Sequence, residues 1–294
     1  MAVIIDNHQL VAAPQPEPLR YGLFNAATVT DDLGTREIAA GFQVPAVDCG
    51  TVRLYDSQCP PGENDPKTFD EGLPHMPADP FWVYSTRQCG LVGETGAELM
   101  DSVRRRLLGG EQTQVEAALW GGTAPPVDPN LTGNVGTVTV VPSAPGAGAA
   151  IAALEESFYS AYGYVGTIHV NQQAYGAIRY AGLITRSDTV HSTAGVLRTP
   201  LGSAWALGAG YGITGPAGIA PAAGFVWAFM TPYVLIRRSG IIAQDDPRAF
   251  INRTTNQFMG LAERVYAATW TCPVVHAVQV PIAAPATAAT PAVP

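Results

Sequence analysis

The longest helical pattern in the chain ends at a cluster of glycines and prolines, and this ending constrains the fold most. Thr95 and Glu98 have the spacing of a capping box, which starts a helix. Apolar residues then recur at helical spacing as far as Trp120. Residues 121–129 contain two glycines and three prolines, which a helix does not accommodate. We predict a long helix that stops at Trp120, and a bend or an interruption at the glycine pair 109–110, because each glycine costs about 1 kcal/mol relative to alanine.

Strand and helix patterns alternate after this ending. Residues 136–141 have the composition of a strand, and an apolar stripe from Ile151 to Phe158 indicates a helix that ends at Gly163. A second strand ends at Asn171, which is expected to cap a short helix. Further strand patterns continue toward the C-terminus, including one apolar strand over residues 225–238. This alternation predicts an α+β or α/β core.

The segments before the long helix do not read as a self-supporting domain. Prolines at positions 14, 16 and 18 impose extended backbone on residues 1–35, so we expect an arm that is disordered or lies on another surface. Residues 36–92 combine strand patterns, the first at 37–47, with a turn-rich centre, and we interpret them as a long two-stranded excursion. An isolated hairpin is barely stable in water, so contacts from outside must hold it.

Charge and composition exclude several classes of function. The net charge is −8, so the chain has no broad positive field for a polyanion such as DNA. Only 14% of residues are charged, against about 25% in an ordinary soluble protein, while 31 glycines and 25 prolines indicate many turns and extended segments. Residues 199–236 carry no charge, but prolines and glycines break this run. We therefore expect buried strands and loops there, and no membrane helix.

The four cysteines are Cys49, Cys59, Cys89 and Cys272, and their spacing matches no zinc site. The N-terminal sequence lacks the basic and apolar regions of a secretory signal. We therefore expect reduced, buried thiols. A disulfide between Cys49 and Cys59 is the alternative in oxidising surroundings.

No motif in the sequence predicts an active site. The G-x-G-x-x-G match at 210–215 is followed by Pro216, whereas dinucleotide binding requires a helix there. We interpret the match as a turn whose glycines adopt positive φ. His169 and His276 lie in apolar strand patterns without a partner at a familiar spacing, and we interpret them as hydrogen-bonded strand residues. We expect no catalytic residue, no cofactor and no metal ion.

The order of these segments resembles that of the major capsid proteins of tailed bacteriophages, whose Hong Kong 97-type fold is shared with encapsulins. Three local patterns carry the resemblance: VEAALWGGTAPPVDPNL at the helix exit, GTIHVNQQAYGAIR in a strand and short helix, and LRTPLGSAWALG in a later strand. The resemblance implies an α+β fold with an N-terminal arm, an extended hairpin called the E-loop, and a long spine helix. It implies an arm at 1–35, the hairpin at 36–92, a peripheral domain at 93–135 and 225–281, an axial domain at 136–224, and an extended or disordered tail at 282–294.

The function that the resemblance implies is self-assembly into an icosahedral shell that encloses viral DNA without reading its sequence. The partners would be copies of the chain in hexamers and pentamers, with portal, scaffold or decoration proteins as further partners. The shell would assemble in the host cytoplasm and become part of the virion, with no enzymatic activity and no membrane. The alternatives are an encapsulin-like compartment, another phage structural protein such as a decoration or tail component, and an α/β enzyme with a loop lid.

Aromatic residues of the excursion are the candidate anchors between subunits: Phe69, Phe81, Trp82 and Tyr84. Aromatic side chains dominate the energy of protein interfaces. The alternative is that these rings pack in the core of their own chain. Some members of the family crosslink neighbouring subunits through an isopeptide bond between a hairpin lysine and an asparagine, which makes Lys67 a crosslink candidate. Its alternative is an ordinary solvated lysine.

Overall fold

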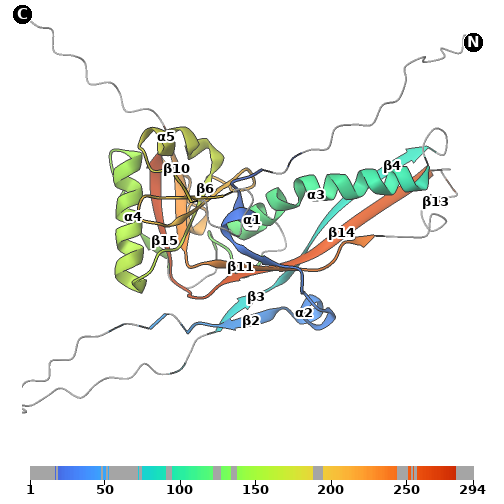
Figure 1. Cartoon of the computed structure of the whole chain (residues 1–294), viewed down its shortest axis with the longest axis horizontal. Coiled ribbons are helices and arrows are strands. Elements are labelled where there is room, and N and C mark those ends of the chain that lie inside the picture. The colour runs from blue at the N-terminus through green and yellow to red at the C-terminus, as the bar shows by residue number, and fades with distance from the viewer. Residues whose placement is uncertain are drawn as a thin grey trace, which may run out of the picture.

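The computed structural model describes residues 19–47, 49–50, 75–90, 95–121, 127–133, 138–187, 195–243 and 257–282, with single residues 17, 52, 72, 251, 252 and 254. The described elements form a six-stranded sheet, a seven-stranded sheet and a projecting two-stranded ladder (Figure 1). Helix α3 (Gly96–Trp120) runs along the six-stranded sheet, and helix α4 (Ala147–Tyr162) covers the seven-stranded sheet. In the described part of the chain, no helix combines the length and the apolarity needed to cross a bilayer.

Helix α3 is a continuous helix of 25 residues. The capping box is confirmed, because Thr95 accepts a hydrogen bond from the Glu98 N–H while Glu98 Oε2 accepts one from the Thr95 N–H at 2.7 Å. The helix ends at Gly121, which adopts the left-handed conformation with φ of 105°. The predicted interruption at 109–110 is wrong. Packing of the apolar helix face outweighs the intrinsic cost of the two glycines, since tertiary contacts supply most helix stability in proteins.

The six-stranded sheet is centred on β14 (Gln257–Trp270). Strand β4 (Pro80–Gly90) pairs antiparallel with β14 along its whole length. The other edge of β14 pairs in turn with β11 (Val234–Arg238), β12 (Ile242–Ala243) and β13 (Ile251–Asn252). Strand β1 (Thr28–Thr30) completes the sheet by pairing parallel with β11.

The strand order of the seven-stranded sheet is β5 (Val138–Val140), β15 (Val275–Pro281), β10 (Phe225–Thr231), β6 (Thr167–Asn171), β9 (Ala204–Gly208), β8 (Val196–Arg198) and β7 (Thr185–Ser187). Helices α4 and α5 (Tyr175–Tyr180) supply the core on one face. The C-terminal end of α3 packs on the other, where the Trp120 ring meets the Phe229 ring edge-on at 5.0 Å. Strands β6 and β9 are buried at every position because both faces are covered.

The local predictions for this sheet are confirmed at its helix ends. Helix α4 ends at Gly163, which adopts the left-handed conformation, and strand β6 ends at Asn171. The Asn171 side chain accepts a hydrogen bond from the Gln173 N–H at 3.0 Å, at the start of the 3₁₀ turn η1 (Gln172–Ala174). A second 3₁₀ turn, η2 (Pro216–Gly218), follows the glycine-rich segment.

One apolar strand pattern turns out to be two strands in different sheets. Strand β10 belongs to the seven-stranded sheet, and β11 belongs to the six-stranded sheet, with Pro232 between them. Strands β14 and β15 make a second crossing between the sheets, near Cys272. Residues 225–281 thus contribute to both sheets, and the domain boundary at 225 stays a prediction.

The N-terminal segment from residue 19 onward lies on the body of its own chain. Helix α1 (Leu23–Ala26) buries Leu23 completely, and the Leu207 N–H of β9 donates to the Tyr21 carbonyl at 2.8 Å. Residues 1–16 and 283–294, which we expect to be arm and tail, lie outside the described residues.

The start of the excursion differs from the predicted strand at 37–47. Helix α2 (Thr35–Ala40) occupies its first residues, with Glu37 accepting a hydrogen bond from the Gly34 N–H at 2.7 Å. Strand β2 (Phe42–Pro45) then pairs antiparallel with β3 (His75–Ala78) as the two-stranded ladder.

Candidate assembly surface

Two of the four predicted anchors lie on an exposed face of the sheet. Trp82 is 50% exposed and Tyr84 is 66% exposed, both on β4. Phe81 points to the opposite face, where its ring stacks on Tyr266 at 5.9 Å in the core of its own chain. Side chains of a strand alternate between faces, so neighbours in the sequence have opposite environments. Phe69 lies outside the described residues, and so does Lys67.

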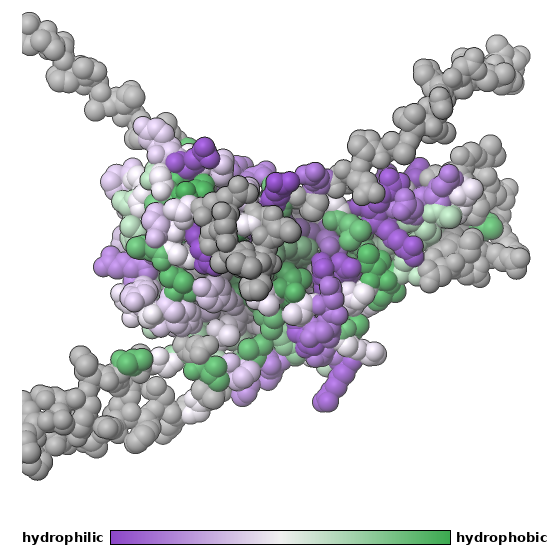
Figure 2. Space-filling view, in the orientation of Figure 1, coloured by the Kyte–Doolittle hydropathy of each residue, from purple (hydrophilic) through white to green (hydrophobic). Residues whose placement is uncertain are grey.

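Neighbouring strands extend this exposed face beyond β4. Met259 and Leu261 of β14 are 44% and 36% exposed and pair with Gln88 and Thr86 of β4. Ile242 of β12 is 43% exposed and pairs with Glu263. We define the outer face as Trp82, Tyr84, Ile242, Met259 and Leu261. Figure 2 shows hydrophobic and hydrophilic side chains mixed on the visible side of the half of the molecule that holds the six-stranded sheet.

One end of the same sheet face is already covered by the chain itself. Leu33 packs on Val265 and Ala267 of β14, with Ile38 of α2 against them. All of Val265 and Ala267 is buried as a result. The apolar cover therefore ends partway along the paired strands β4 and β14. The outer face is the part of this sheet face that remains open to solvent.

Two arginines of β11 hold the segment that leads into the hairpin. Arg237 Nε donates to Asp32 Oδ1 at 2.9 Å, and its Nη1 pairs with Glu37. Arg238 pairs with Asp31 in the same way. Hydrogen bonding to these guanidinium groups lowers the pKa of Asp31 and Asp32 below the ordinary value. The carboxylates are therefore ionised at neutral pH and hold β1 and α2 on the sheet.

Helix α3 carries a buried carboxylate at a point where three parts of the chain meet. Glu116 Oε1 accepts from the Leu23 N–H at 2.9 Å, and Oε2 accepts from the Gly210 N–H at 3.0 Å. The side chain has no exposed surface, and burial raises the pKa of Glu116. This residue joins the N-terminal segment, α3 and the loop after β9.

The glycines at 210–215 serve this contact, and our prediction of positive φ for them is wrong. Gly210, Gly212 and Gly215 are absent from the described glycines with positive φ. A Cβ atom at Gly210 would lie 1.9 Å from the Thr113 carbonyl oxygen, and one at Gly212 would lie 2.8 Å from the Trp120 ring. Glycine is required because the loop backbone touches the helix.

The strand histidines are hydrogen-bonded structural residues, as predicted. His169 is fully buried, with Nδ1 2.8 Å from the Tyr211 hydroxyl and Nε2 2.8 Å from Thr231 Oγ1. Burial lowers the pKa of His169 to about 3, so the ring is neutral at physiological pH. His276 Nδ1 lies 2.8 Å from Ser157 Oγ, and burial lowers its pKa as well.

Cavities near α4 bear on the enzyme alternative. One of about 430 Å³ is lined by glycine, alanine, proline and isoleucine, with Gln173 and Tyr180 as its polar members. Another, of about 400 Å³, includes Glu155, whose Oε1 accepts 2.6 Å hydrogen bonds from the hydroxyls of Thr199 and Ser203. Within the described ranges, no cluster of three His, Cys, Asp or Glu residues is arranged to hold a metal ion. Glu156, Tyr159 and Tyr164 also line the second cavity.

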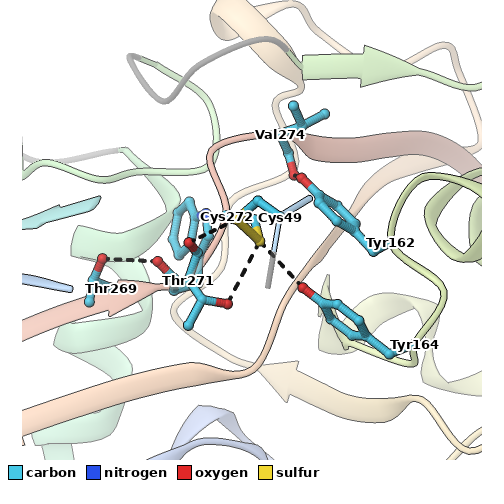
Figure 3. Close-up of a disulfide and its surroundings, with 8 residues drawn as sticks. Cys49, Tyr162, Tyr164, Thr269, Thr271, Cys272 and Val274 are labelled. Carbon is cyan, nitrogen blue, oxygen red and sulfur yellow. Dashed lines mark hydrogen bonds between the residues drawn. A yellow bond between two sulfur atoms is a disulfide. The ribbon is translucent and has the colours of Figure 1, made fainter. Parts of the chain in front are cut away.

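A disulfide joins Cys49 to Cys272, and this finding corrects the prediction of reduced thiols for both residues and of a Cys49–Cys59 bond (Figure 3). Sequence spacing could not reveal the pair, because 223 positions separate its members. Cys59 lies outside the described residues.

The contribution of Met259 and Leu261 to the outer face was also missed, although both alternate with buried residues in the sequence FMGLAERVY.

Comparisons with known proteins identify the fold through structure alone. No protein-family model and no curated protein matches the sequence. The capsid of an empty GTA particle matches with a TM-score of 0.56 at 12% identity, over 95% of this chain and 96% of that chain. A structure from Mycobacterium phage Adephagia matches with a TM-score of 0.53 at 13% identity, over 94% and 93%.

An encapsulin shows the same likeness. The holo-SrpI encapsulin complex from Synechococcus elongatus PCC 7942 matches with a TM-score of 0.51 at 11% identity, over 95% of both chains. Each of these matches covers at least 94% of this chain. The resemblance inferred from the sequence is therefore confirmed, and the chain has the α+β, Hong Kong 97-type fold found in phage capsid proteins and encapsulins.

Proposed function

We propose that this chain is a major capsid protein that assembles with copies of itself into a closed icosahedral shell around a viral genome. The observation that carries the proposal is the whole-chain likeness to the capsid of a GTA particle, which covers 95% of this chain and 96% of that one. A fold alone does not fix a function, so the exposed surfaces must also suit assembly.

The outer face suits such an assembly. It combines a tryptophan, a tyrosine and three aliphatic side chains that are each at least 36% exposed. Aromatic and methionine side chains are enriched where subunits meet, and the best anchors lie in patches that lose all their water on binding. We infer that a neighbouring copy covers the outer face, with Trp82 and Tyr84 as its anchors.

The projecting ladder supports the same inference. Strands β2 and β3 form a sheet of two strands, in which Met76 and Ala78 of β3 are buried against their own chain while the residues of β2 are partly or fully exposed. A two-stranded sheet gains stability from further support. A copy of the chain can supply that support, and repeated contacts of this kind close into a shell when the rotation between copies permits it. We propose that α3 and the six-stranded sheet form the peripheral domain and the seven-stranded sheet the axial domain, which moves β10 and β15 out of the peripheral range 225–281 that the sequence predicts.

The net charge of the chain suits a shell that encloses DNA but binds it weakly. The net charge of −8 offers little attraction to phosphates, whose neutralisation by Lys and Arg drives DNA binding. We propose the virion as its location, with portal, scaffold or decoration proteins as further partners. The Lys67 crosslink stays a prediction, and boiled particles that release monomer-sized bands on denaturing electrophoresis would exclude it.

Negative-stain microscopy and light scattering of the purified chain test the proposal. We expect uniform closed particles, far larger than a single chain of 30.8 kDa. The double variant Tyr84→Ser/Leu261→Ser should remain folded by circular dichroism but lose the particles, because it removes anchors from the outer face.

The matched control is Tyr180→Ser, since Tyr180 is 81% exposed on α5 and lies away from the outer face. This control should assemble normally. A small monodisperse species from the unaltered chain would contradict the proposal. Closed particles that hold protein cargo and no DNA after expression with the phage genome would indicate an encapsulin-like compartment instead.

A further inference from the structure

The disulfide joins the segment that follows β2 to the segment in which the chain passes from β14 to β15. Cys49 follows β2, and Cys272 follows β14 at the point where the chain crosses to β15. Their Cα atoms are 5.5 Å apart, a separation that a disulfide spans without movement of the backbone. The same backbone can therefore hold either the bond or two neighbouring thiols.

The two strands of the ladder differ in how they are held. Strand β3 leads into β4, which pairs with β14 along its whole length. Strand β2 pairs with β3 in the two-stranded sheet, and Val47 beyond its end is 57% exposed. The disulfide is thus a covalent attachment at the end of the less supported strand. Opening it would release the end of β2 while leaving the β4–β14 ladder paired.

The surroundings of the bond give its two sulfur atoms different roles. A cleft of about 780 Å³ borders Gly50 and Thr271, which are the sequence neighbours of Cys49 and Cys272. Cys272 is fully buried, whereas Cys49 is partly exposed. Because Cys49 is the more exposed of the two residues, we assign its Sγ as the atom that an incoming thiolate attacks, with Cys272 as the leaving group.

Tyr164 is placed to assist this exchange. Its hydroxyl lies 3.4 Å from Cys272 Sγ, and Figure 3 shows the ring pointing toward the sulfur pair. A hydroxyl at this distance donates a weak hydrogen bond to a sulfur atom. The bond would strengthen as Cys272 leaves as a thiolate, because hydrogen bonds to charged acceptors are stronger than those to neutral ones. Exchange is faster when the leaving thiolate is more stable.

We propose that Cys49 and Cys272 are a redox-modification site that exchanges with glutathione and latches the base of the hairpin. In the closing step, two cysteine thiols and one oxidised glutathione give one protein disulfide and two reduced glutathione molecules. The reverse step opens the latch through a mixed disulfide on Cys49. The latch is open in a reducing cytosol and closed in oxidising surroundings. Its role in a released shell rests on the proposed function.

Thiol mapping of the purified, unassembled chain is the first test. The chain is equilibrated with reduced or oxidised glutathione, free thiols are alkylated, and peptides are identified by mass spectrometry. We expect the Cys49–Cys272 peptide pair to disappear in reduced glutathione and to return in oxidised glutathione. A Cys49 that remains alkylated in oxidised glutathione, or that pairs with Cys59, would overturn the proposal.

Hydrogen exchange on the same samples tests the mechanical role of the bond. Residues 43–47 should exchange about tenfold faster in the reduced chain, while residues 81–86 of β4 stay unchanged, since local opening is confined to weakly held segments. Cys49→Ser should reproduce the reduced pattern even in oxidised glutathione. The matched control Cys59→Ser/Cys89→Ser, which retains both latch cysteines, should behave like the unaltered chain. Equal exchange in both redox states would overturn the latch.

The role of Tyr164 has its own readout. Tyr164→Phe should leave the disulfide intact but slow its reduction by glutathione about threefold to tenfold, because the departing thiolate loses its donor. Unchanged reduction kinetics would overturn this role. All of these measurements use the unassembled chain, so a chain that forms the latch but no particles would contradict the proposed function alone. Where particles form, closed-latch particles should resist dissociation by urea better than reduced ones.

Discussion

The two sheets of this molecule differ in how completely their own chain buries them. The seven-stranded sheet lies between α4 and the end of α3, and strands β6 and β9 are buried at every position. The six-stranded sheet is covered by α3 on one face, while the other face leaves Trp82 and Tyr84 open to solvent. The first sheet is therefore covered on both faces by its own chain, whereas the second leaves part of one face open, and we propose that another copy covers it.

The largest expected loss of stability follows from a cavity in the core of the seven-stranded sheet. Phe158 is fully buried, with its ring 4.9 Å from Tyr162 and 5.5 Å from His276. Phe158→Ala should lower the free energy of unfolding by about 4 kcal/mol, because it removes a large side chain and leaves a cavity. Tyr84→Ala on the open sheet should change it by less than about 0.5 kcal/mol. Urea unfolding of both variants measures the difference, and equal losses would refute the contrast between the sheets.

The next largest loss of stability is expected where the loop after β9 contacts helix α3. Gly210→Ala should cost about 3 kcal/mol, because the new Cβ meets the backbone of Thr113, which cannot rotate away. Gly176→Ala is the control, since α5 leaves open space at Gly176 and alanine favours a helix by about 1 kcal/mol. Thermal unfolding should move in opposite directions for the two variants. A neutral Gly210→Ala would show that the loop does not need its close approach.

A smaller loss is expected at the buried carboxylate. Glu116→Gln keeps the size of the side chain but turns an amide donor toward either the Leu23 or the Gly210 N–H. One buried backbone donor then has no acceptor, at a cost of about 2 kcal/mol. Urea unfolding at neutral pH measures this cost. A gain in stability would mean that the burial cost which raises the pKa of Glu116 exceeds the value of the hydrogen bonds that its carboxylate accepts.

The smallest effect concerns the surface pairs that hold the hairpin base. The pKa values of Asp31 and Asp32 are lowered in the folded chain by their hydrogen bonds to Arg238 and Arg237. Their contribution is therefore present above the unfolded pKa of about 3.9 and is lost as the pH falls through the lower folded values. The protection factors of the β1 amides, which correct for the pH dependence of the intrinsic exchange rate, should fall over that acidic range. Asp31→Asn/Asp32→Asn should show low protection already at neutral pH, and pH-independent protection factors in the unaltered chain would contradict the assignment.

Local signals in the sequence were enough for much of the fold. The capping box at Thr95, the glycine at 163 and the cap at Asn171 depend on neighbours within a few residues, and all three are present. The order of these segments was enough to recognise the capsid-type fold. The break at Pro232 was missed because both halves of the pattern are apolar, and only the pairing partners show that they belong to different sheets.

The candidate surface was harder to predict, because it depends on register and on distant contacts. A shift of one position decides that Phe81 is buried and Trp82 exposed, and the sequence shows adjacent aromatics without their direction. The Cys49–Cys272 bond and the Glu116 contacts to Leu23 join residues that are far apart in the chain. Such contacts leave no periodic pattern, so they emerge only from the folded structure.

Tryptophan fluorescence offers the most direct test of the claim that copies of this chain complete the open sheet. Trp82 is 50% exposed, whereas Trp120, Trp205, Trp227 and Trp270 are at most 4% exposed, and these five are all the tryptophans in the chain. Acrylamide quenching of the unassembled chain therefore reports on Trp82. Quenching should fall to the level of the variant Trp82→Phe once closed particles form. Particles in which Trp82 remains as quenchable as in the free chain would contradict the account.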